Sequence, residues 1–271
     1  MTPIWPRHTL GKPDRPALLF LHGFMGSAQD WKAVAQICAQ DYFCILVDLP
    51  GHGQNIHLPL KTRLDFKAWS QALVSLADQL ALESVCLIGY SLGGRLALHA
   101  ALNFPTRWAA LVLEGCNPGI EDSKARQARL EEDEQRAADV LQEGMQAFVD
   151  RWYEMELFSS LRRLPDLMES VNRERVRNDS IWMAKVLREL SPAAQPNAWQ
   201  QLAALHLPAL LIAGELDIAY GAVVRRMQTQ LPDAQTLILP AAGHNAHLER
   251  PQAFAGALLD FLDDVFKGVN Q

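Results

Sequence analysis

Short apolar runs recur along this sequence, and longer stretches with helical periodicity separate them. The runs that read as buried strands are residues 17–21 (ALLFL), 43–49, 84–90, 110–115, 208–214 and 235–240. Helical patterns lie near residues 28–40, 65–81, 92–102, 220–231 and 247–267. Most of the runs are apolar on both faces, as in a parallel sheet that helices cover on each side. The alternation therefore predicts an α/β fold with a doubly wound, mostly parallel sheet.

The alternation stops between residues 119 and 200. This segment is rich in arginine, glutamate, glutamine and alanine, it has no strand-like run, and its stretches 125–155 and 166–190 have helical periodicity. Roughly 80 residues are far more than an ordinary connection between two sheet strands needs. Ordinary covering helices are the alternative. We expect a helical cap at 119–200, inserted between two parts of the core at 1–118 and 201–271.

The composition argues against several classes of function. A formal net charge of −6 lacks the basic excess of a nucleic-acid-binding protein, although a pocket can still be locally positive. The four cysteines show no metal-ligand spacing, so we expect reduced structural cysteines and no metal site. We find no leader-like apolar core at the start and no run of the about 18 apolar residues that a membrane span needs. These features favour a cytoplasmic protein.

The stretch GYSLGG, residues 89–94, has the G-x-S-x-G pattern of a nucleophile elbow. A chance match to so short a pattern is common. Here, however, the pattern follows a predicted strand and opens a predicted helix, as an elbow requires. The glycines allow a sharp turn and keep the hydroxyl group of Ser91 clear of neighbouring side chains. We therefore predict Ser91 as the reactive hydroxyl.

A serine hydroxyl needs an activating histidine and an acid, which in this fold follow the serine along the chain. Asp217 and His244 come after the last two apolar runs, in that order. The competing acids are Glu114, Asp48 and Glu215. Asp217 lies far enough past its strand for a loop to bring its carboxylate to the histidine. We predict a triad of the elbow serine, Asp217 and His244.

The sequence His-Gly-Phe at residues 22–24 directly follows the first predicted strand. A loop at this place supplies one backbone N–H to an oxyanion, and the residue after the serine supplies another. We predict the N–H groups of Phe24 and Leu92 as these donors. We expect His22 to have a structural role within its loop.

The motifs HGF, DLPGHG, GYSLGG, GELD and AGHNAH come in an order and spacing that resembles the α/β-hydrolase superfamily over nearly the whole chain. GYSLGGR, LEGCNPGI, ARQAR and FVDRWYEMELFSSL add a narrower resemblance, to the family of 2-succinyl-6-hydroxy-2,4-cyclohexadiene-1-carboxylate synthases of menaquinone and phylloquinone biosynthesis. Members of that family are lyases that eliminate pyruvate from 2-succinyl-5-enolpyruvyl-6-hydroxy-3-cyclohexene-1-carboxylate. The resemblance implies an α/β-hydrolase fold with a helical cap, a small tricarboxylate substrate and no cofactor.

Arg95 lies four residues after Ser91, one helical turn away on nearly the same face. The elbow helix is normally buried where it begins, and a buried guanidinium needs an anionic or strongly accepting partner. A carboxylate of the protein is one candidate partner, and a carboxylate of the substrate is the other. The resemblance favours the substrate.

The same resemblance implies a set of substrate-binding residues: Tyr90, Arg95, Arg129, Trp152 and Arg173. Arg126 is the alternative to the first cap arginine, and Arg177 is the alternative to Arg173. For the tyrosine and the tryptophan, packing against the elbow or in the cap is the alternative role. The run CNPG departs from the family pattern, because Cys116 and Asn117 stand where a small and an imidazole residue are expected.

The implied mechanism uses the triad as a base. His244, oriented by Asp217, polarises Ser91, whose oxygen removes the ring proton next to the succinyl carbonyl. The oxyanion donors stabilise the negative charge on that carbonyl oxygen, and enolpyruvate leaves. Two other functions stay open from the sequence: hydrolysis of an ester or a C–C bond by the same triad, and ligand binding without catalysis.

Overall fold

The computed structural model describes residues 5–267, and a seven-stranded sheet forms the centre of this part of the chain. The strands are β1 (Arg7–Leu10), β2 (Ala17–Leu21), β3 (Phe43–Val47), β4 (Val85–Tyr90), β5 (Ala110–Glu114), β6 (Ala209–Gly214) and β7 (Ala234–Leu239). Their order across the sheet is β1-β3-β2-β4-β5-β6-β7. Every apolar run of the sequence forms a strand, so the predicted α/β fold is confirmed.

The strands β2 to β7 are parallel, whereas β1 pairs with β3 in antiparallel fashion. The carboxyl ends of parallel strands share one edge of a sheet, so the loops after β2, β4, β6 and β7 meet there. The sequence pattern misses β1. Its four residues, RHTL, are mostly exposed and form no apolar run.

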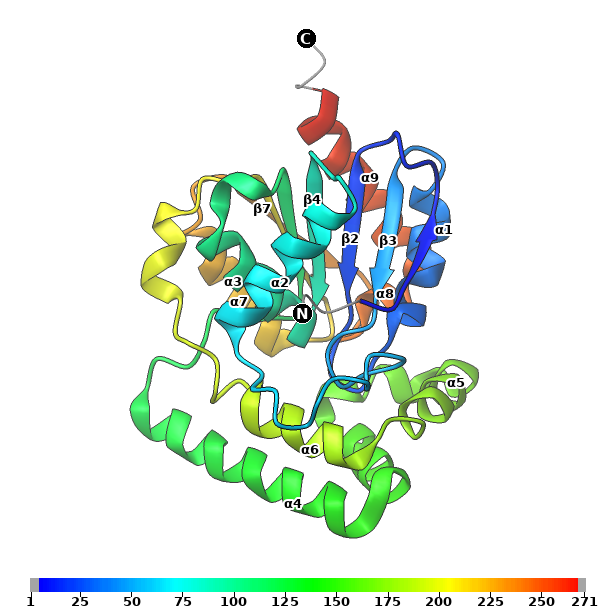
Figure 1. Ribbon diagram of the computed structural model, residues 1–271, viewed down its shortest axis with the longest axis vertical. Helices are drawn as coiled ribbons and strands as arrows, with labels where there is room; N and C mark the ends of the chain where they lie inside the picture. Colours follow the sequence, from blue (N-terminus) through cyan, green and yellow to red (C-terminus); the bar gives the residue numbers. More distant parts are fainter. Residues whose placement is uncertain (1–4, 268–271) are drawn as a thin grey trace.

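Helices cover both faces of the sheet (Figure 1). Successive residues of a strand point to opposite faces, so in β2 Leu19 and Leu21 pack on one side and Leu18 and Phe20 on the other. The first face is covered by α2 (Phe66–Gln79), α3 (Leu92–Asn103) and α7 (Ile218–Gln228). The second face is covered by α1 (Lys32–Cys38) and α9 (Pro251–Lys267).

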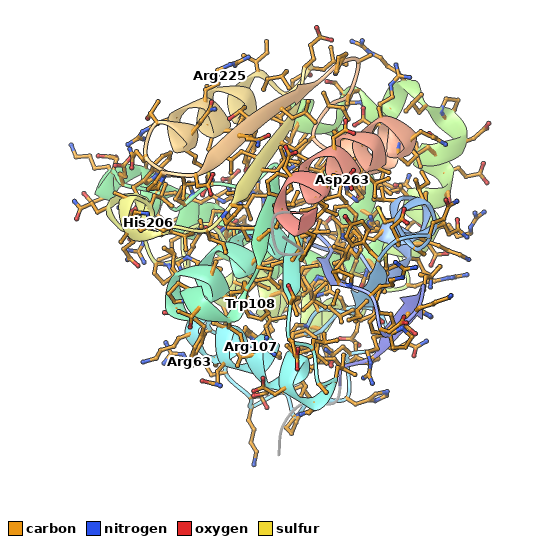
Figure 2. The ribbon with its side chains drawn as sticks, turned by 90° about the horizontal axis from the view of Figure 1, so that it is seen from above. Arg63, Arg107, Trp108, His206, Arg225 and Asp263 are labelled. Carbon is orange, nitrogen blue, oxygen red and sulfur yellow. The ribbon has the colours of Figure 1, made fainter. Side chains whose placement is uncertain are left out.

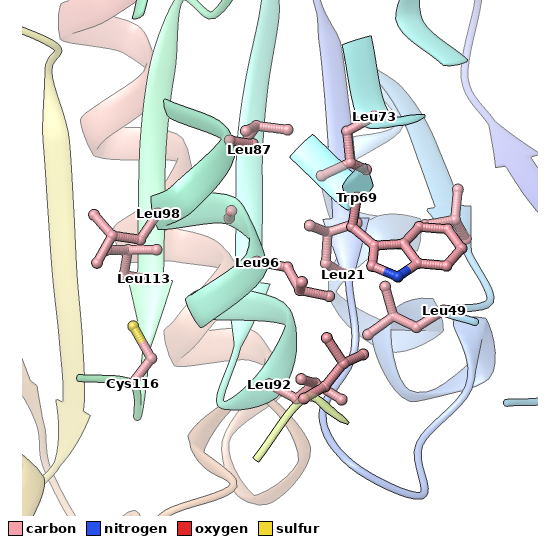
Figure 3. Close-up of a cluster of buried hydrophobic side chains, with 14 of the residues drawn as sticks. Leu21, Leu49, Trp69, Leu73, Leu87, Leu92, Leu96, Leu98, Leu113 and Cys116 are labelled. Atoms are coloured by element: carbon pink, nitrogen blue, oxygen red, sulfur yellow. The ribbon is translucent and has the colours of Figure 1, made fainter. Parts of the chain in front are cut away.

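The larger hydrophobic cluster fixes the direction in which α3 leaves the sheet (Figure 3). Leu87 of β4, Leu96 of α3 and Trp69 of α2 belong to it, and each is less than 5% exposed: 0%, 1% and 4%. Burial of one such side chain contributes on the order of 2 kcal/mol. Leu92, the first residue of α3, packs in the same cluster. The residue after the predicted nucleophile is therefore anchored in the core.

Short helical elements occur between the longer helices and strands of the described chain. The short elements are η1 (Ala28–Trp31), η2 (Pro105–Arg107), η3 (Glu156–Phe158), η4 (Leu161–Arg163), η5 (Trp199–Ala204) and α8 (Ala246–Glu249). Figure 2 shows Arg63, His206 and Arg225 at the periphery, where all three are exposed. No helix within residues 5–267 has the length and apolar character needed to cross a membrane.

Three helices lie between β5 and β6 in the sequence, below the sheet in Figure 1: α4 (Ser123–Glu154), α5 (Pro165–Arg175) and α6 (Ser180–Glu189). Asp122 and Asp179 accept N–H bonds from the first turns of α4 and α6, which fixes where these helices begin. The sequence predicts one helical stretch at 125–155, but α4 is bent at Gly144, whose φ is 79° and ψ 174°. The outer boundaries of the cap, 119 and 200, stay a prediction.

Hydrogen bonds connect these helices to core loops that are distant in sequence. Arg175 of α5 forms a bidentate ion pair with Asp30, at 2.9 and 2.7 Å, and its Nε donates to the Tyr153 hydroxyl at 3.1 Å. Asn178 donates to the Met25 carbonyl oxygen at 2.8 Å. Asp30 and Met25 both lie in the loop region after β2. The cap is therefore anchored beside the predicted oxyanion loop.

Candidate active site

Ser91 lies at the turn between β4 and α3 with φ 49° and ψ −108°, a conformation that L residues rarely adopt. Glycines make this turn possible. A Cβ atom at Gly89 would lie 2.5 Å from the carbonyl carbon of Gly93, and one at Gly93 would lie 2.2 Å from the Leu21 carbonyl oxygen. The Ser91 N–H donates to the Glu114 carbonyl oxygen at 2.8 Å. This is the geometry of a nucleophile elbow.

Asp217 and His244 meet at the same edge of the sheet. His244 Nδ1 donates to Asp217 Oδ2 at 2.6 Å, and the two side chains are 2% and 3% exposed. Asp217 Oδ1 accepts the N–H of Tyr220 at 3.2 Å in the first turn of α7, which holds the carboxylate in place. Because Nδ1 is the donor, the neutral imidazole has its lone pair on Nε2. His244 is therefore oriented as a base.

Ser91 and His244 line the same cavity. Within residues 5–267 the Ser91 hydroxyl has no hydrogen-bond partner, and catalytic hydrogen bonds often tighten only in the substrate complex. The ring of Tyr220 lies 4.7 Å from the ring of His244, and that of Phe158 lies 6.0 Å from it. A Cβ atom at Gly115 would lie 2.8 Å from His244 Cε1. Close packing on several sides thus fixes the imidazole beside the serine.

The competing acids are occupied elsewhere. Glu114 forms a buried pair with His247, whose Nδ1 lies 2.8 Å from the carboxylate. Glu215 is exposed and accepts a backbone N–H from the loop after β7 at 3.0 Å. Asp48 accepts two loop N–H groups, at 2.8 and 2.9 Å. The structure therefore brings Asp217, and none of the three alternatives, to the histidine.

The loop after β2 lies directly against the elbow. A Cβ atom at Gly23 would lie 2.5 Å from the ring of Tyr90 and 3.6 Å from Ser91 Cβ. Next to it, His22 is buried, donates from Nδ1 to the Gly23 carbonyl oxygen at 2.7 Å and accepts the Leu49 N–H on Nε2 at 2.9 Å. Burial lowers the pKa of His22 to about 4, so the ring is neutral and holds the loop.

The two predicted oxyanion donors lie on either side of the serine. Phe24 and Leu92 both line the cavity. In the described part of the chain neither backbone N–H is bonded to an acceptor. Buried or cavity-facing N–H groups without a partner are uncommon, and they are what an oxyanion hole offers to a ligand. The arrangement supports the predicted pair of donors.

The cavity has a volume of about 880 Å³, its open mouth included, and lies between the elbow and the cap. Aromatic and aliphatic side chains form much of its wall. Its charged residues are Arg95, Arg129, Arg136 and Arg175, and no aspartate or glutamate of residues 5–267 lines it. Guanidinium groups bind carboxylates through parallel hydrogen bonds. The wall therefore suits a small ligand that carries several carboxylates.

Arg95 points into this cavity from α3 and is 7% exposed. Its Nη1 donates to the Leu190 carbonyl oxygen at 2.8 Å, and its guanidinium lies 5.8 Å from the centre of the Phe66 ring. No carboxylate of the described residues forms an ion pair with it, and burial lowers its pKa to about 10. The sequence allows either a protein carboxylate or a substrate carboxylate as the partner of Arg95, and within residues 5–267 no protein carboxylate takes this place.

The cap residues implied by the resemblance divide into those at the cavity and those outside it. Arg129 lines the cavity, whereas Arg126 donates to the Ala193 carbonyl oxygen at 2.8 Å and does not. Trp152 lines it as well, with its ring 5.0 Å from that of Phe24. Tyr90 lines it from the elbow. Of the two alternative arginines, Arg129 is therefore the one that lines the cavity.

Arg173 does not lie at the cavity, contrary to its assignment as a substrate-binding residue. Its side chain is 58% exposed and lies 3.9 Å from Glu169. The alternative, Arg177, is 66% exposed and pairs with Glu174. Arg175 lines the cavity instead, because positions two residues apart lie on different sides of a helix. Its spacing of four residues from buried Val171 indicates this inward face.

The run CNPG forms a turn in which Asn117 Oδ1 accepts the Gly119 N–H at 3.0 Å. Cys116 packs against the elbow helix, where a Cβ atom at Gly94 would lie 2.9 Å from its Cβ. These two residues support the turn and do not line the cavity. All four cysteines are buried and free. Among the described residues no group of three or more histidine, cysteine and acidic side chains is placed to hold a metal ion.

Comparison with known proteins agrees with this geometry. Residues 16–251 match the family model described as alpha/beta hydrolase fold. The chain is 36% identical over 251 residues, 92% of this chain and 91% of the relative, to the putative 2-succinyl-6-hydroxy-2,4-cyclohexadiene-1-carboxylate synthase of Bacillus subtilis (strain 168). It is 36% identical over 261 residues, 96% of this chain and 91% of the relative, to the synthase of Yersinia pestis bv. Antiqua (strain Nepal516).

A solved structure is similar over almost its full length. The structure of MenH from S. aureus superimposes with a TM-score of 0.92 and 28% sequence identity, over 96% of this chain and 98% of that one. The matches extend through the cap as well as the core. The chain therefore belongs to the α/β-hydrolase fold family and, within it, to the family of 2-succinyl-6-hydroxy-2,4-cyclohexadiene-1-carboxylate synthases.

Proposed function

We propose that this protein is a lyase that eliminates pyruvate from 2-succinyl-5-enolpyruvyl-6-hydroxy-3-cyclohexene-1-carboxylate. The product is 2-succinyl-6-hydroxy-2,4-cyclohexadiene-1-carboxylate. One observation supports this function above the others: Arg95, buried and without a carboxylate partner among residues 5–267, shares a cavity with the serine and histidine of a triad. An anionic substrate supplies the missing partner.

In the proposed first step the triad works as a base. The Asp217 carboxylate holds His244 by Nδ1, so Nε2 can take the hydroxyl proton of Ser91. The Ser91 oxygen removes the proton from the ring carbon next to the succinyl carbonyl. This C–H bond breaks, and its electron pair moves into the carbonyl, whose oxygen becomes negative. No acyl-enzyme forms.

The second step expels the leaving group. The N–H groups of Phe24 and Leu92 stabilise the negative oxygen while the enolate forms. When the carbonyl re-forms, the electron pair shifts through the ring double bond and breaks the C–O bond to the enolpyruvyl group. The enolpyruvate anion that leaves takes up the proton that His244 received from Ser91 and so becomes pyruvate, and the ring gains its second double bond.

The remaining cavity residues bind the three carboxylates and the ring. Arg95 and Arg129 are the proposed carboxylate ligands, and Trp152 and Tyr90 are the proposed contacts to the apolar part of the substrate. Arg175 also lines the cavity, but its three guanidinium nitrogens donate to Asp30 and Tyr153, so we assign it a structural role. A planar guanidinium pairs with a carboxylate through two hydrogen bonds. We also propose that the enzyme works in the cytoplasm, since its four cysteines are free and buried.

Pyruvate release tests this function. The substrate is made enzymatically in situ because it breaks down spontaneously, and that background is subtracted. Wild-type protein and the Ser91→Ala variant are compared, and a parallel assay offers a neutral p-nitrophenyl ester. We expect fast pyruvate release that depends on Ser91, with little ester cleavage.

The same experiment separates the proposed lyase from a serine hydrolase. Both functions use the same triad, so the loss of activity in Ser91→Ala alone does not distinguish them. Ester cleavage without accelerated pyruvate release would overturn the lyase and leave the fold and triad intact. A Ser91→Ala variant that kept pyruvate release within a few fold of wild type would refute the general-base role of the serine.

A further inference from the structure

Asp133 is a buried acid in a helix whose other charged side chains reach solvent. It lies in the first half of α4, where Glu131, Glu132 and Glu134 are exposed. Asp133 itself is 1% exposed. Burial of a carboxylate costs several kcal/mol unless charged or polar groups compensate it. The position of Asp133 therefore has to be explained by its partners.

Both partners of Asp133 are arginines that line the active-site cavity. Arg129 Nε donates to Asp133 Oδ1 at 2.8 Å, and Arg136 Nη1 donates to the same oxygen at 3.3 Å. The second oxygen, Oδ2, is buried and has no hydrogen-bond partner among the described residues. The carboxylate thus lies directly between the two guanidinium groups, one turn before and one turn after it.

This pairing leaves the two Nη groups of Arg129 free to bind a ligand. Its bond to Asp133 uses Nε, so the two Nη groups, which form the fork that grips carboxylates, have no acceptor in residues 5–267. Burial has the largest effect on the pKa of Arg95 and lowers it; Arg129 lowers it further, and Asp133 acts in the opposite direction. Asp133 is the buried acid that pairs with both Arg129 and Arg136.

Arg136 joins the same wall of the cavity. Its guanidinium lies 5.3 Å from the centre of the Trp152 ring, and its Nη2 pairs with Glu132 at 2.6 Å. Glu132 is 52% exposed, so this second pair is largely screened by solvent. Arg136 keeps its Nε and one Nη1 hydrogen free. It is held between Asp133 and the indole, facing the space that Arg129 also lines.

We infer that Asp133 is a positioning residue that holds Arg129 and Arg136 as a two-arginine site for one carboxylate of the substrate. The inference rests on the proposed function for the identity of the substrate, and it adds Arg136 to the residues that bind it. Asp133 acts through the arginines and does not touch the substrate. Its buried, partly unpaired carboxylate fixes both side chains toward the cavity.

The first test compares the two acids that share these arginines. We expect Asp133→Ala to raise KM for the lyase substrate at least tenfold and to change kcat less than threefold. Glu132→Ala is expected to change both less than twofold, because its pair is exposed. Asp133→Asn keeps an acceptor at Oδ1 and should fall between them, which also covers the case in which the alanine variant fails to fold.

The second test removes the added arginine. Arg136→Gln should raise KM about tenfold, whereas Arg151→Gln on the same helix should have no effect, because Arg151 is 46% exposed and does not line the cavity. A thermal melt of each variant checks that the fold is intact. Equal effects of Asp133→Ala and Glu132→Ala, or an unchanged KM in Arg136→Gln, would overturn the inference.

A binding assay separates this inference from the proposed reaction. Calorimetry measures the Kd of propane-1,2,3-tricarboxylate, with its uncharged triamide as the control. We expect binding of the tricarboxylate only, weakened at least tenfold by Asp133→Ala. If the wild type bound it in this way but released no pyruvate, the reaction would be wrong and the two-arginine site would stand. Equal affinity for the two probes would refute the site.

Discussion

The core and the segment 119–200 of this protein use charge in different ways. All eight histidines of the sequence lie outside 119–200, and two of them, His22 and His244, make the central hydrogen bonds of the active site. The segment 119–200 has no histidine but ten arginines. The groups proposed to transfer protons thus lie in the core, whereas three of the four arginines that line the cavity, Arg129, Arg136 and Arg175, lie in the segment 119–200. If these roles hold, such a division would let the substrate-binding wall change without altering the groups that move protons.

The largest effect that can test this division is expected in the core. Asp217→Asn reverses the polarity of its bond to His244, so the proton moves to Nε2 and the base is lost. Pyruvate release should fall about 10⁴-fold, as for the equivalent change in a serine protease triad. Glu215→Gln, an exposed neighbour, should change the rate less than about twofold. Retention of a tenth of the wild-type rate in Asp217→Asn would contradict the assigned acid.

The next largest effect concerns the connection between the two regions. Asp30→Ala leaves the buried guanidinium of Arg175 without its bidentate partner, so the free energy of unfolding should fall by about 3–5 kcal/mol. Urea denaturation measures it. Glu169→Ala removes only the exposed pair with Arg173 and should cost less than about 0.5 kcal/mol. Similar losses in both variants would show that the cap is not anchored at Asp30.

Arg95 is the exception to this division, because it is a cavity arginine that belongs to the core and not to the segment 119–200. Arg95→Met keeps the side-chain length and removes the charge, so KM for the lyase substrate should rise about tenfold to hundredfold, or about 1.4–2.7 kcal/mol. Arg225→Met, at the exposed periphery, is the matched control. Steady-state kinetics measure both. An unchanged KM in Arg95→Met would place all carboxylate recognition in the cap.

The last expected effect, similar in size for each residue to that of Arg95→Met, is the response of the core to acid. Burial lowers the pKa of His22 to about 4, of His52 to about 3 and of His99 to about 4, each from an ordinary value of 6.5. The unfolded chain therefore binds more protons below pH 6.5. The stability is fully present above 6.5 and is lost as the pH falls toward these folded values, by about 2 kcal/mol per histidine between pH 7 and pH 5.

Urea denaturation at a series of pH values checks this response. The slope of unfolding free energy against pH reports the protons taken up on unfolding. His99→Gln should reduce that uptake near pH 5 by about one proton, since one of the three rings with a lowered pKa is gone. An unchanged slope in this variant would mean that His99 is already protonated in the folded protein.

The parts that the sequence predicts are those in which chain order and backbone geometry decide the structure. The strands β2 to β6 are fully buried and β7 is partly buried, and each of the six lies in an apolar run. The elbow needs glycines at 89 and 93 because other residues would collide with the backbone. The order of Ser91, Asp217 and His244 follows from the order of parallel strands. The pattern therefore specifies the fold and points to the triad: Ser91 and His244 line one cavity, and Asp217 is hydrogen-bonded to His244.

The parts that the sequence leaves open depend on rotation about helix axes and on distant contacts. Arg173, Arg175 and Arg177 are equivalent in composition, and only the packing of α5 on Asp30 turns Arg175 inward. Arg136 reaches the cavity through Asp133 and Trp152, a relation that no local motif reveals. Cap arginines can pair with acids or with substrate, and the sequence alone does not decide between them.

The bend at Gly144 has a consequence for the shape of ligand that this cavity accepts. The part of α4 before Gly144 carries Arg129 and Arg136, and the part after it carries Trp152 and Tyr153. The cationic and the aromatic side of the cavity therefore come from two helical segments that run in different directions. The angle between these segments depends on the backbone conformation of Gly144, which favours glycine, and the space beside Gly144 is open. A substitution at Gly144 can therefore change the shape of the cavity while every residue that lines it stays the same.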